Sequence, residues 1–233
     1  MERLKKVAVN RALSDIRFFT ERVLRYQLTA FHEKWFLFQL DNKETLILAP
    51  RGHGKSTVCT ISFALWRVIQ NPDIRILIVS NTASQAESFL REIRTQLTQN
   101  EVLTCLFGWA PAGSPRWSQT EIIVSERRRI AKEATVTALG VGGPVISKHY
   151  DTIILDDIID EENARTEQQR EKMQVWFYKS LLPCLEPDGE IHILGTRYHP
   201  YDLYNQLLAA CNSKAAAFMP RDEAPCVSAG RRN

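Results

Sequence analysis

The sequence predicts an α/β fold in which helices flank both faces of a mainly parallel central sheet. Four short apolar runs recur along the 233 residues, and each has the composition of a strand buried on both faces. Segments with helical periodicity separate these runs, and strands that alternate with helices favour parallel pairing. The predicted strands are residues 44–49, 74–80, 151–156 and 190–195.

Helical patterns precede, separate and follow these strands. In the first of them, Leu13, Ile16 and Phe19 recur at spacings close to 3.6 residues. The turn signal Asn71-Pro72-Asp73 ends another. We expect helices over residues 11–40, 55–69, 82–99, 161–182 and 202–210.

The chain divides into three expected parts. Residues 1–40 form a helical segment, residues 41–210 form the α/β core, and residues 211–233 form an irregular tail because their periodicity is lost. Within the core, residues 119–139 alternate in patches and predict a hairpin. The tip of this hairpin carries the basic residues Arg127, Arg128 and Arg129.

Composition excludes several classes of protein. Hydrophobic residues make up 44% and charged residues 24%, which suits a folded core and argues against general disorder. The five cysteines are dispersed, which predicts reduced thiols and neither a disulfide framework nor a zinc site. No apolar run is long enough to cross a bilayer, and no secretory signal is expected at the N-terminus. The net charge of +3 permits a polyanionic partner without requiring one.

A glycine-bearing loop, APRGHGKS, lies between the first predicted strand and a predicted helix. Gly52 and Gly54 allow backbone N–H groups to turn toward phosphate oxygens, and the helix N-terminus also favours an anion. Lys55 can reach the β- and γ-phosphates of ATP, and the Ser56 hydroxyl can ligate Mg²⁺. The predicted nucleotide-binding residues are Pro50, Arg51, Gly52, His53, Gly54, Lys55, Ser56 and Thr57.

One residue departs from the usual loop pattern, GxxxxGK[ST], because Ala49 stands in place of the first glycine. The alternative interpretation is a glycine-rich turn before a helix, with Lys55 as an ordinary surface charge. The strand before the loop and the helix after it favour the phosphate-binding interpretation.

A second pattern is the predicted strand that ends in two carboxylates, Asp156 and Asp157. We expect Asp156 to hold Mg²⁺ while facing the loop from the adjacent strand, and Asp157 to orient the attacking water. Glu161 or Glu162 could orient the water instead, since glutamate more often has this role. The alternative is a solvated turn whose acidic residues cap the next helix.

Four motifs occur in a fixed order and together resemble the ATPase domain of a tailed-phage terminase large subunit, a DNA-packaging motor. They are FHxxWF, APRxxGKST, a strand ending in LDD, and a strand ending in GTRYH. The resemblance covers roughly residues 25–208, and Ala49 and Arg51 are typical of that family. It implies an additional-strand, RecA-like P-loop NTPase fold with Walker A and Walker B motifs.

The resemblance also implies roles for individual residues. Arg51 is similar to the loop arginine that senses the γ-phosphate, and Gly195-Thr196 is similar to the motif that couples hydrolysis to movement. Phe31 and His32 fall where the family contacts adenine. The alternatives are that Phe31 belongs to the core and that Thr196 is an ordinary strand-end hydroxyl.

Basic residues are candidates for contacts with DNA or with a neighbouring subunit. Terminases commonly complete the active site with an arginine from a neighbouring copy, and Lys148 stands where some members carry it. Arg127, Arg128 and Arg129 could bind DNA phosphates or act in the neighbouring site. The alternative for the three arginines is a solvated hairpin tip.

The implied function is hydrolysis of ATP with Mg²⁺ to translocate double-stranded DNA into a procapsid. The implied partners are the portal protein, the small terminase subunit and further copies of the chain in a ring on the procapsid. The alternative is that the ATPase domain is a monomer when it is isolated. We expect action in the host cytoplasm, no membrane partner, and no endonuclease activity because no nuclease domain is expected after residue 210. The alternatives are a helicase-like ATPase stimulated by nucleic acid, a P-loop kinase, and a non-catalytic DNA-binding module.

Overall fold

The computed structural model describes residues 2–108, 117–210 and 216–218. Within these residues, seven strands form one sheet in the order β3-β4-β2-β5-β6-β1-β7. All neighbouring strands pair in parallel except β3 and β4, which are antiparallel. The strands are β1 (Glu44–Leu48), β2 (Ile76–Ser80), β3 (Glu121–Ile122), β4 (Val136–Gly140), β5 (Tyr150–Asp156), β6 (Leu185–Gly195) and β7 (Ala216–Phe218).

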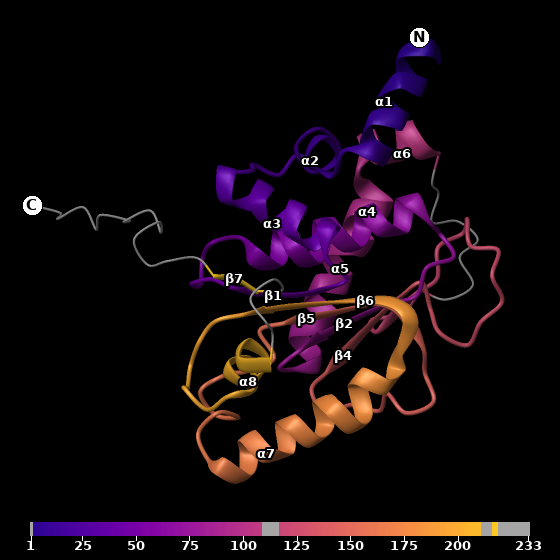
Figure 1. Cartoon of the computed structure of the whole chain (residues 1–233). Helices are drawn as coiled ribbons and strands as arrows, with labels where there is room; N and C mark the ends of the chain where they lie inside the picture. The colour runs from indigo at the N-terminus through magenta and orange to yellow at the C-terminus, as the bar shows by residue number, and fades with distance from the viewer. Residues whose placement is uncertain (1, 109–116, 211–215, 219–233) are drawn as a thin grey trace, which may run out of the picture.

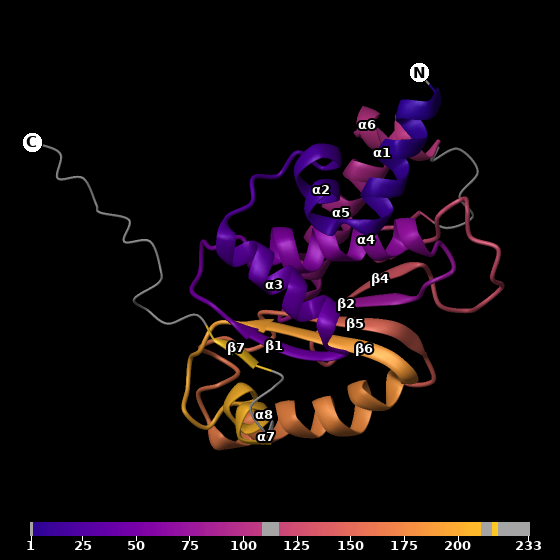
Figure 2. The same ribbon diagram turned by 45° about the horizontal axis from the view of Figure 1, so that its top comes forward.

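Helices cover both faces of the sheet, as the alternating pattern predicts (Figures 1 and 2). On one face lie α1 (Glu2–Ser14), α2 (Ile16–Phe18), α3 (Ala30–Asp41), α4 (Phe63–Gln70), α5 (Ala83–Gln99) and α6 (Glu101–Phe107). On the other face lie α7 (Glu167–Trp176) and α8 (Leu203–Ala210). None of the helices in the described residues is both long and apolar enough to span a membrane.

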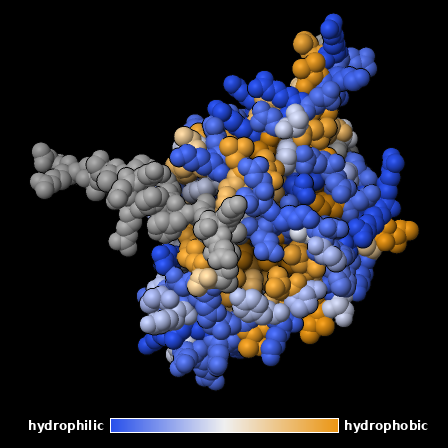
Figure 3. Space-filling view, in the orientation of Figure 1, coloured by the Kyte–Doolittle hydropathy of each residue, from blue (hydrophilic) through white to orange (hydrophobic). Residues whose placement is uncertain are grey.

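The central strands are apolar on both sides because each side packs against its own layer of helices. In β2, Ile76 and Ile78 belong to one buried cluster, while Leu77 and Val79 belong to the cluster on the opposite face. The molecular surface seen in Figure 3 is mostly hydrophilic, which accords with this burial. Two-sided burial explains why the strand runs lack polar alternation.

The sheet order brings the two predicted motifs to one edge but not onto neighbouring strands. Strand β6 lies between β1 and β5, so the expectation that Asp156 faces the loop from an adjacent strand is wrong. Leu48 pairs with Gly195 and Asp156 pairs with Leu194, so the carboxyl ends of all three strands lie at one level. The edge therefore brings together the loop after β1, the carboxylates of β5 and the end of β6.

Several predicted element boundaries are wrong. The helical stretch expected over residues 11–40 begins earlier, with α1 at Glu2, and is interrupted at residues 25–29, where Arg25 adopts a φ of 62° that a right-handed helix does not allow. The helix expected from residue 161 begins at Glu167, because Thr166 caps it through the Gln169 N–H while the Gln169 side chain accepts from the Thr166 N–H. The acidic residues before it form turns, since Asp160 and Asn163 hydrogen-bond to each other. Strand β6 begins at Leu185, five residues earlier than expected, and extends along β5.

The predictions for the C-terminal tail and for the hairpin at residues 119–139 are confirmed only in part. Ala216–Phe218, within the tail expected to be irregular, form β7 and pair with β1, while the rest of residues 211–233 lies outside the described residues. The predicted hairpin is present as the short antiparallel pair of β3 and β4, joined by residues 123–135. The connecting residues 109–116 lie outside the described residues.

Candidate functional site

A cleft of about 520 Å³ lies where the parallel strands end. The loop at residues 51–57 forms one wall, and the ends of β2 and β5 form the floor. The N-terminal part of α5 closes one side, through residues that include Gln85 and Phe89. Parallel α/β sheets commonly bind their ligands at this edge, which makes the cleft the candidate site.

The loop has the backbone conformation that its glycines allow. Gly52 and Gly54 have φ angles of 80° and 71°, in the left-handed region that side-chain-bearing residues rarely adopt. After Lys55, Ser56–Ser62 form a π-helical segment that continues into α4. A helix therefore starts at the loop with its N-terminus toward the cleft, an arrangement that favours anions.

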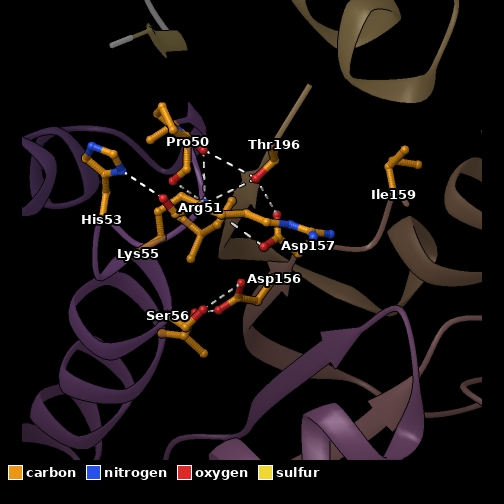
Figure 4. Close-up of polar contacts among 12 residues, drawn as sticks. Pro50, Arg51, His53, Lys55, Ser56, Asp156, Asp157, Ile159 and Thr196 are labelled. Atoms are coloured by element: carbon orange, nitrogen blue, oxygen red, sulfur yellow. Dashed lines mark hydrogen bonds and ion pairs between the residues drawn. The ribbon is translucent and has the colours of Figure 1, made fainter. Parts of the chain in front are cut away.

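Lys55 is buried at the centre of this site (Figure 4). Its Nζ donates to the carbonyl oxygens of Ala49 and Pro50 at 3.0 and 3.2 Å, and to Thr196 Oγ1 at 3.3 Å. The Asp157 carboxylate lies 4.0 Å from the same nitrogen. The interpretation of Lys55 as an ordinary surface charge is therefore wrong, and its ammonium joins the ends of β1 and β6.

Asp156 is fully buried and bridges to the helix after the loop. Its carboxylate accepts from Ser56 Oγ at 3.1 Å and from Thr60 Oγ1 at 2.6 Å. The pKa of Asp156 is raised to about 6, chiefly because the carboxyl is buried and also because the Asp157 charge is near, while the two hydroxyl donors and Lys55 act in the opposite direction. Thr60 was missed at the sequence level, although its place one turn after Ser56 puts both hydroxyls on one helix face.

Replacing Thr60 by Val is expected to lower the free energy of unfolding by about 1.5–3 kcal/mol, because a buried carboxylate loses a short hydrogen bond. Urea denaturation of both proteins measures the difference. Thr95→Val is the matched control, since the Thr95 hydroxyl bonds only to its own helix at Arg91 O and is exposed. Equal losses in the two variants would contradict the role of Thr60.

Asp157 differs from Asp156 in both conformation and exposure. It adopts a φ of 47°, and its N–H donates to Leu194 O at 2.9 Å. Its Oδ1 accepts from Thr196 Oγ1 at 3.3 Å, and its side chain is 37% exposed. Non-glycine residues in this conformation occur preferentially at functional sites. Asp157 thus presents a carboxylate to the cleft from the strained end of β5.

The end of β6 is tightly packed behind these groups. A Cβ at Gly195 would lie 2.4 Å from the Tyr204 ring, so only glycine fits there. The Tyr204 hydroxyl accepts from the Ile159 N–H at 3.3 Å and donates to Leu194 O at 3.4 Å. Helix α8 therefore holds both the end of β6 and the loop after Asp157.

Arg51 lines the cleft, and its side chain extends from the loop toward Asp157, as Figure 4 shows. Its guanidinium donates to the hydroxyl of Tyr198 and lies 5.5 Å from the centre of the tyrosine ring. Tyr198 belongs to the segment that follows Thr196. The loop after β1 and the loop after β6 therefore meet at the opening of the cleft.

Several predicted residues lie outside the cleft. Phe31 packs against the ring of Trp35, and His32 contacts the backbone of the loop from behind. Glu161 and Glu162 are exposed and do not line the cleft, whereas Asp160 does. The predicted alternatives to Asp157 are thus placed away from the loop.

The basic candidates lie at the opposite edge of the sheet. Lys148 precedes β5 and pairs with Glu121 at 3.7 Å. The backbone N–H groups of Arg128 and Arg129 bind the Asp73 carboxylate, at 2.7 Å each. Arg127 donates to the carbonyl oxygen of Glu133. Lys148 precedes the amino end of β5, and the length of this seven-residue strand, about 20 Å, separates that end from Asp156, so Lys148 lies far from the cleft of its own chain.

The fold and this site define an α/β protein of the phosphate-loop class. The loop follows a central parallel strand and opens a helix, and β6 is the additional strand between the loop strand and the acidic strand. The predicted fold class is confirmed.

Comparison with known proteins gives one sequence relative. The chain is similar to the terminase large subunit of Enterobacteria phage T3, with 30% identity over 175 residues, 72% of this chain and 28% of that protein. The chain thus spans less than a third of that relative's length. This match confirms the resemblance to terminase large subunits that the motifs indicate.

Two further comparisons add little. A solved DEAD box protein from the hyperthermophile Methanococcus jannaschii is 15% identical, with a TM-score of 0.43 over 78% of this chain and 46% of that chain. That similarity is too low to support an argument. No family model matches the chain.

Proposed function

We propose that the chain is the ATPase motor domain of a viral terminase large subunit, which hydrolyses ATP to translocate double-stranded DNA into a procapsid. The observation that carries this proposal is the convergence of Lys55, Ser56, Asp156 and Asp157 on one cleft beside a glycine-bearing loop, with Thr196 in contact with both Lys55 and Asp157. The similarity to the phage T3 protein supports the biological setting.

The residues present fit a Mg²⁺ ion that arrives with the nucleotide. Ser56 and Asp156 offer the hard oxygen ligands that Mg²⁺ prefers, and they lie 3.1 Å apart. Among the described residues, no group of three or more His, Cys, Asp or Glu side chains could hold a metal by itself. This agrees with an ion held partly by substrate phosphates. When bound, Mg²⁺ supplies neutralisation of the charge that develops on the β- and γ-oxygens.

The chain's own residues account for the rest of the proposed reaction. Lys55 and the loop N–H groups bind and neutralise the β- and γ-phosphates, and Arg51 reaches the γ-phosphate from the loop. Asp157 accepts a hydrogen bond from the attacking water and orients it in line with the breaking bond. Thr196 touches both Lys55 and Asp157, so a change at the γ-phosphate can pass to the end of β6.

The proposed partners follow from the same family. They are double-stranded DNA, the portal protein, the small terminase subunit and further copies of the chain in a ring, acting in the host cytoplasm. Lys148 and the three arginines lie at the edge opposite the cleft, where they can contact DNA phosphates or the cleft of a neighbouring copy.

Release of inorganic phosphate from ATP, measured with and without linear double-stranded DNA, tests the proposal. We expect turnover that needs Mg²⁺, needs no phosphate acceptor and rises with double-stranded DNA. Stimulation only by single strands would indicate the helicase-like alternative, and a requirement for an acceptor would indicate a kinase. Absence of ATP binding would overturn the proposal.

A further inference from the structure

His32 lies directly behind the loop and touches its backbone. Its Nε2 is 2.8 Å from the carbonyl oxygen of His53, and His32 is only 7% exposed. On the other side of the ring, the Thr29 N–H donates to Nδ1 at 3.2 Å. The ring thus connects the start of α3 to the residue between the two loop glycines.

These contacts fix the tautomer of His32. A backbone N–H can only donate, so Nδ1 must be the acceptor and the proton of the neutral ring must lie on Nε2. Nε2 therefore donates to the His53 carbonyl oxygen. Burial lowers the pKa of His32, which favours this neutral form, while its bond to His53 acts in the opposite direction.

The bond to His53 orients a complete peptide group. The peptide between His53 and Gly54 is trans, and in a trans peptide the C=O and N–H bonds point in opposite directions. With the carbonyl held at His32, the Gly54 N–H points away from His32, and both residues of this peptide line the cleft. A Cβ at Gly54 would lie in tight contact with His32 Nε2, at 3.1 Å, and the φ of 71° separately favours glycine there.

We propose that His32 is a positioning residue that holds the His53–Gly54 peptide in the orientation needed to bind phosphate, and that it does not contact the nucleotide base. The proposal rests on the proposed function, because it assigns the anion in the cleft to a nucleotide phosphate. It differs from the role that the family resemblance implies, in which His32 contacts adenine. His32 lies outside the residues that line the cleft, which agrees with a role behind the loop.

Three substitutions separate the two hydrogen bonds of His32. His32→Gln can keep both, because glutamine at this helix position accepts from the N-cap N–H and its amide can donate to His53. His32→Glu keeps only the acceptor. His32→Leu removes both bonds and buries no charge, so it serves if the glutamate variant does not fold.

Calorimetric titration with Mg²⁺–tripolyphosphate and with Mg²⁺–ATP provides the test, since tripolyphosphate has no base. We expect His32→Gln to bind both within about threefold of wild type, and His32→Glu or His32→Leu to bind both about tenfold more weakly. Equal losses for the two ligands support a role in positioning the loop.

A loss for ATP alone would instead assign His32 to the base, and wild-type binding of tripolyphosphate in every variant would overturn the proposal. Binding as weak in His32→Gln as in His32→Leu would also overturn it, because the donor would then not matter. The proposed function fails separately, when the wild-type chain binds tripolyphosphate but releases no phosphate from ATP.

Discussion

Lys55→Ala is expected to lower ATP turnover by about 10²–10³-fold or more, because it removes a buried ammonium that contacts the loop and the strand ends. The Lys55 Nζ interacts with groups directly after β1, β5 and β6, a position that the Arg51 guanidinium does not share because it donates to Tyr198. A steady-state assay of phosphate release measures the effect. The loss should appear in kcat as well as in kcat/KM, since developing charge on the γ-phosphate is stabilised mainly in the transition state.

The matched control for this prediction is Lys43→Ala. Lys43 directly precedes β1, the strand that leads into the loop, and so lies at the end of β1 away from the cleft. The Lys43 side chain is 65% exposed and pairs with the exposed Asp188 at 3.6 Å. Its removal should change turnover little, because exposed pairs of this kind contribute about 0–1 kcal/mol. Thermal unfolding of both variants checks that Lys55→Ala remains folded. Wild-type turnover in folded Lys55→Ala would refute the phosphate-binding assignment of the loop.

The parts of the fold that could be predicted are those whose signal is local. Strands such as 151–156 are recognisable because burial on both faces demands a continuous apolar run. The start of α7 could not be found from its acidic residues, because Asp160 and Asn163 bond to each other and Thr166 offers a better cap. Strand β7 has no signal of its own, since its pairing depends on β1, far away in sequence.

In the candidate site, too, some residues have a local sequence signal and others depend on contacts between distant segments. The loop residues could be predicted because glycines, a lysine and a hydroxyl must be consecutive for the backbone to surround a phosphate. Gln85 and Phe89 line the cleft only because α5 packs against the helix after the loop, which no single segment encodes. Thr60 reaches Asp156 only because that same helix packs against β5. The position of His32 behind the loop likewise depends on how α3 packs.

The identity of the water-orienting carboxylate could not be settled from the sequence. Asp157, Glu161 and Glu162 are close along the chain, and glutamate is the more usual residue. Their separation in space depends on the turns after β5, where Ile159 binds Tyr204 and Asp160 binds Asn81. Those contacts leave Asp157 in the cleft and direct the chain away before the glutamates.

Asp157→Asn is accordingly expected to lower kcat for ATP hydrolysis by about 10²–10⁴-fold while changing the affinity for ATP by less than about threefold. Asparagine has nearly the same shape and tolerates the left-handed conformation that Asp157 adopts, so the backbone at the end of β5 should persist. The amide can still accept a hydrogen bond from Thr196, but it can no longer accept a proton from water. Single-turnover phosphate release and ATP titration measure the two quantities separately.

Glu161→Gln and Glu162→Gln are the paired controls, because each removes one carboxylate within a few residues of Asp157 in the chain. Neither glutamate lines the cleft, so both variants should hydrolyse ATP at rates close to wild type. A glutamate reaching the γ-phosphate would need the turns after β5 to open, breaking the bonds of Asp160 to Asn81 and Asn163. The reverse result, with activity kept in Asp157→Asn and lost in Glu162→Gln, would show that nucleotide binding rearranges this loop and would assign the water to Glu162.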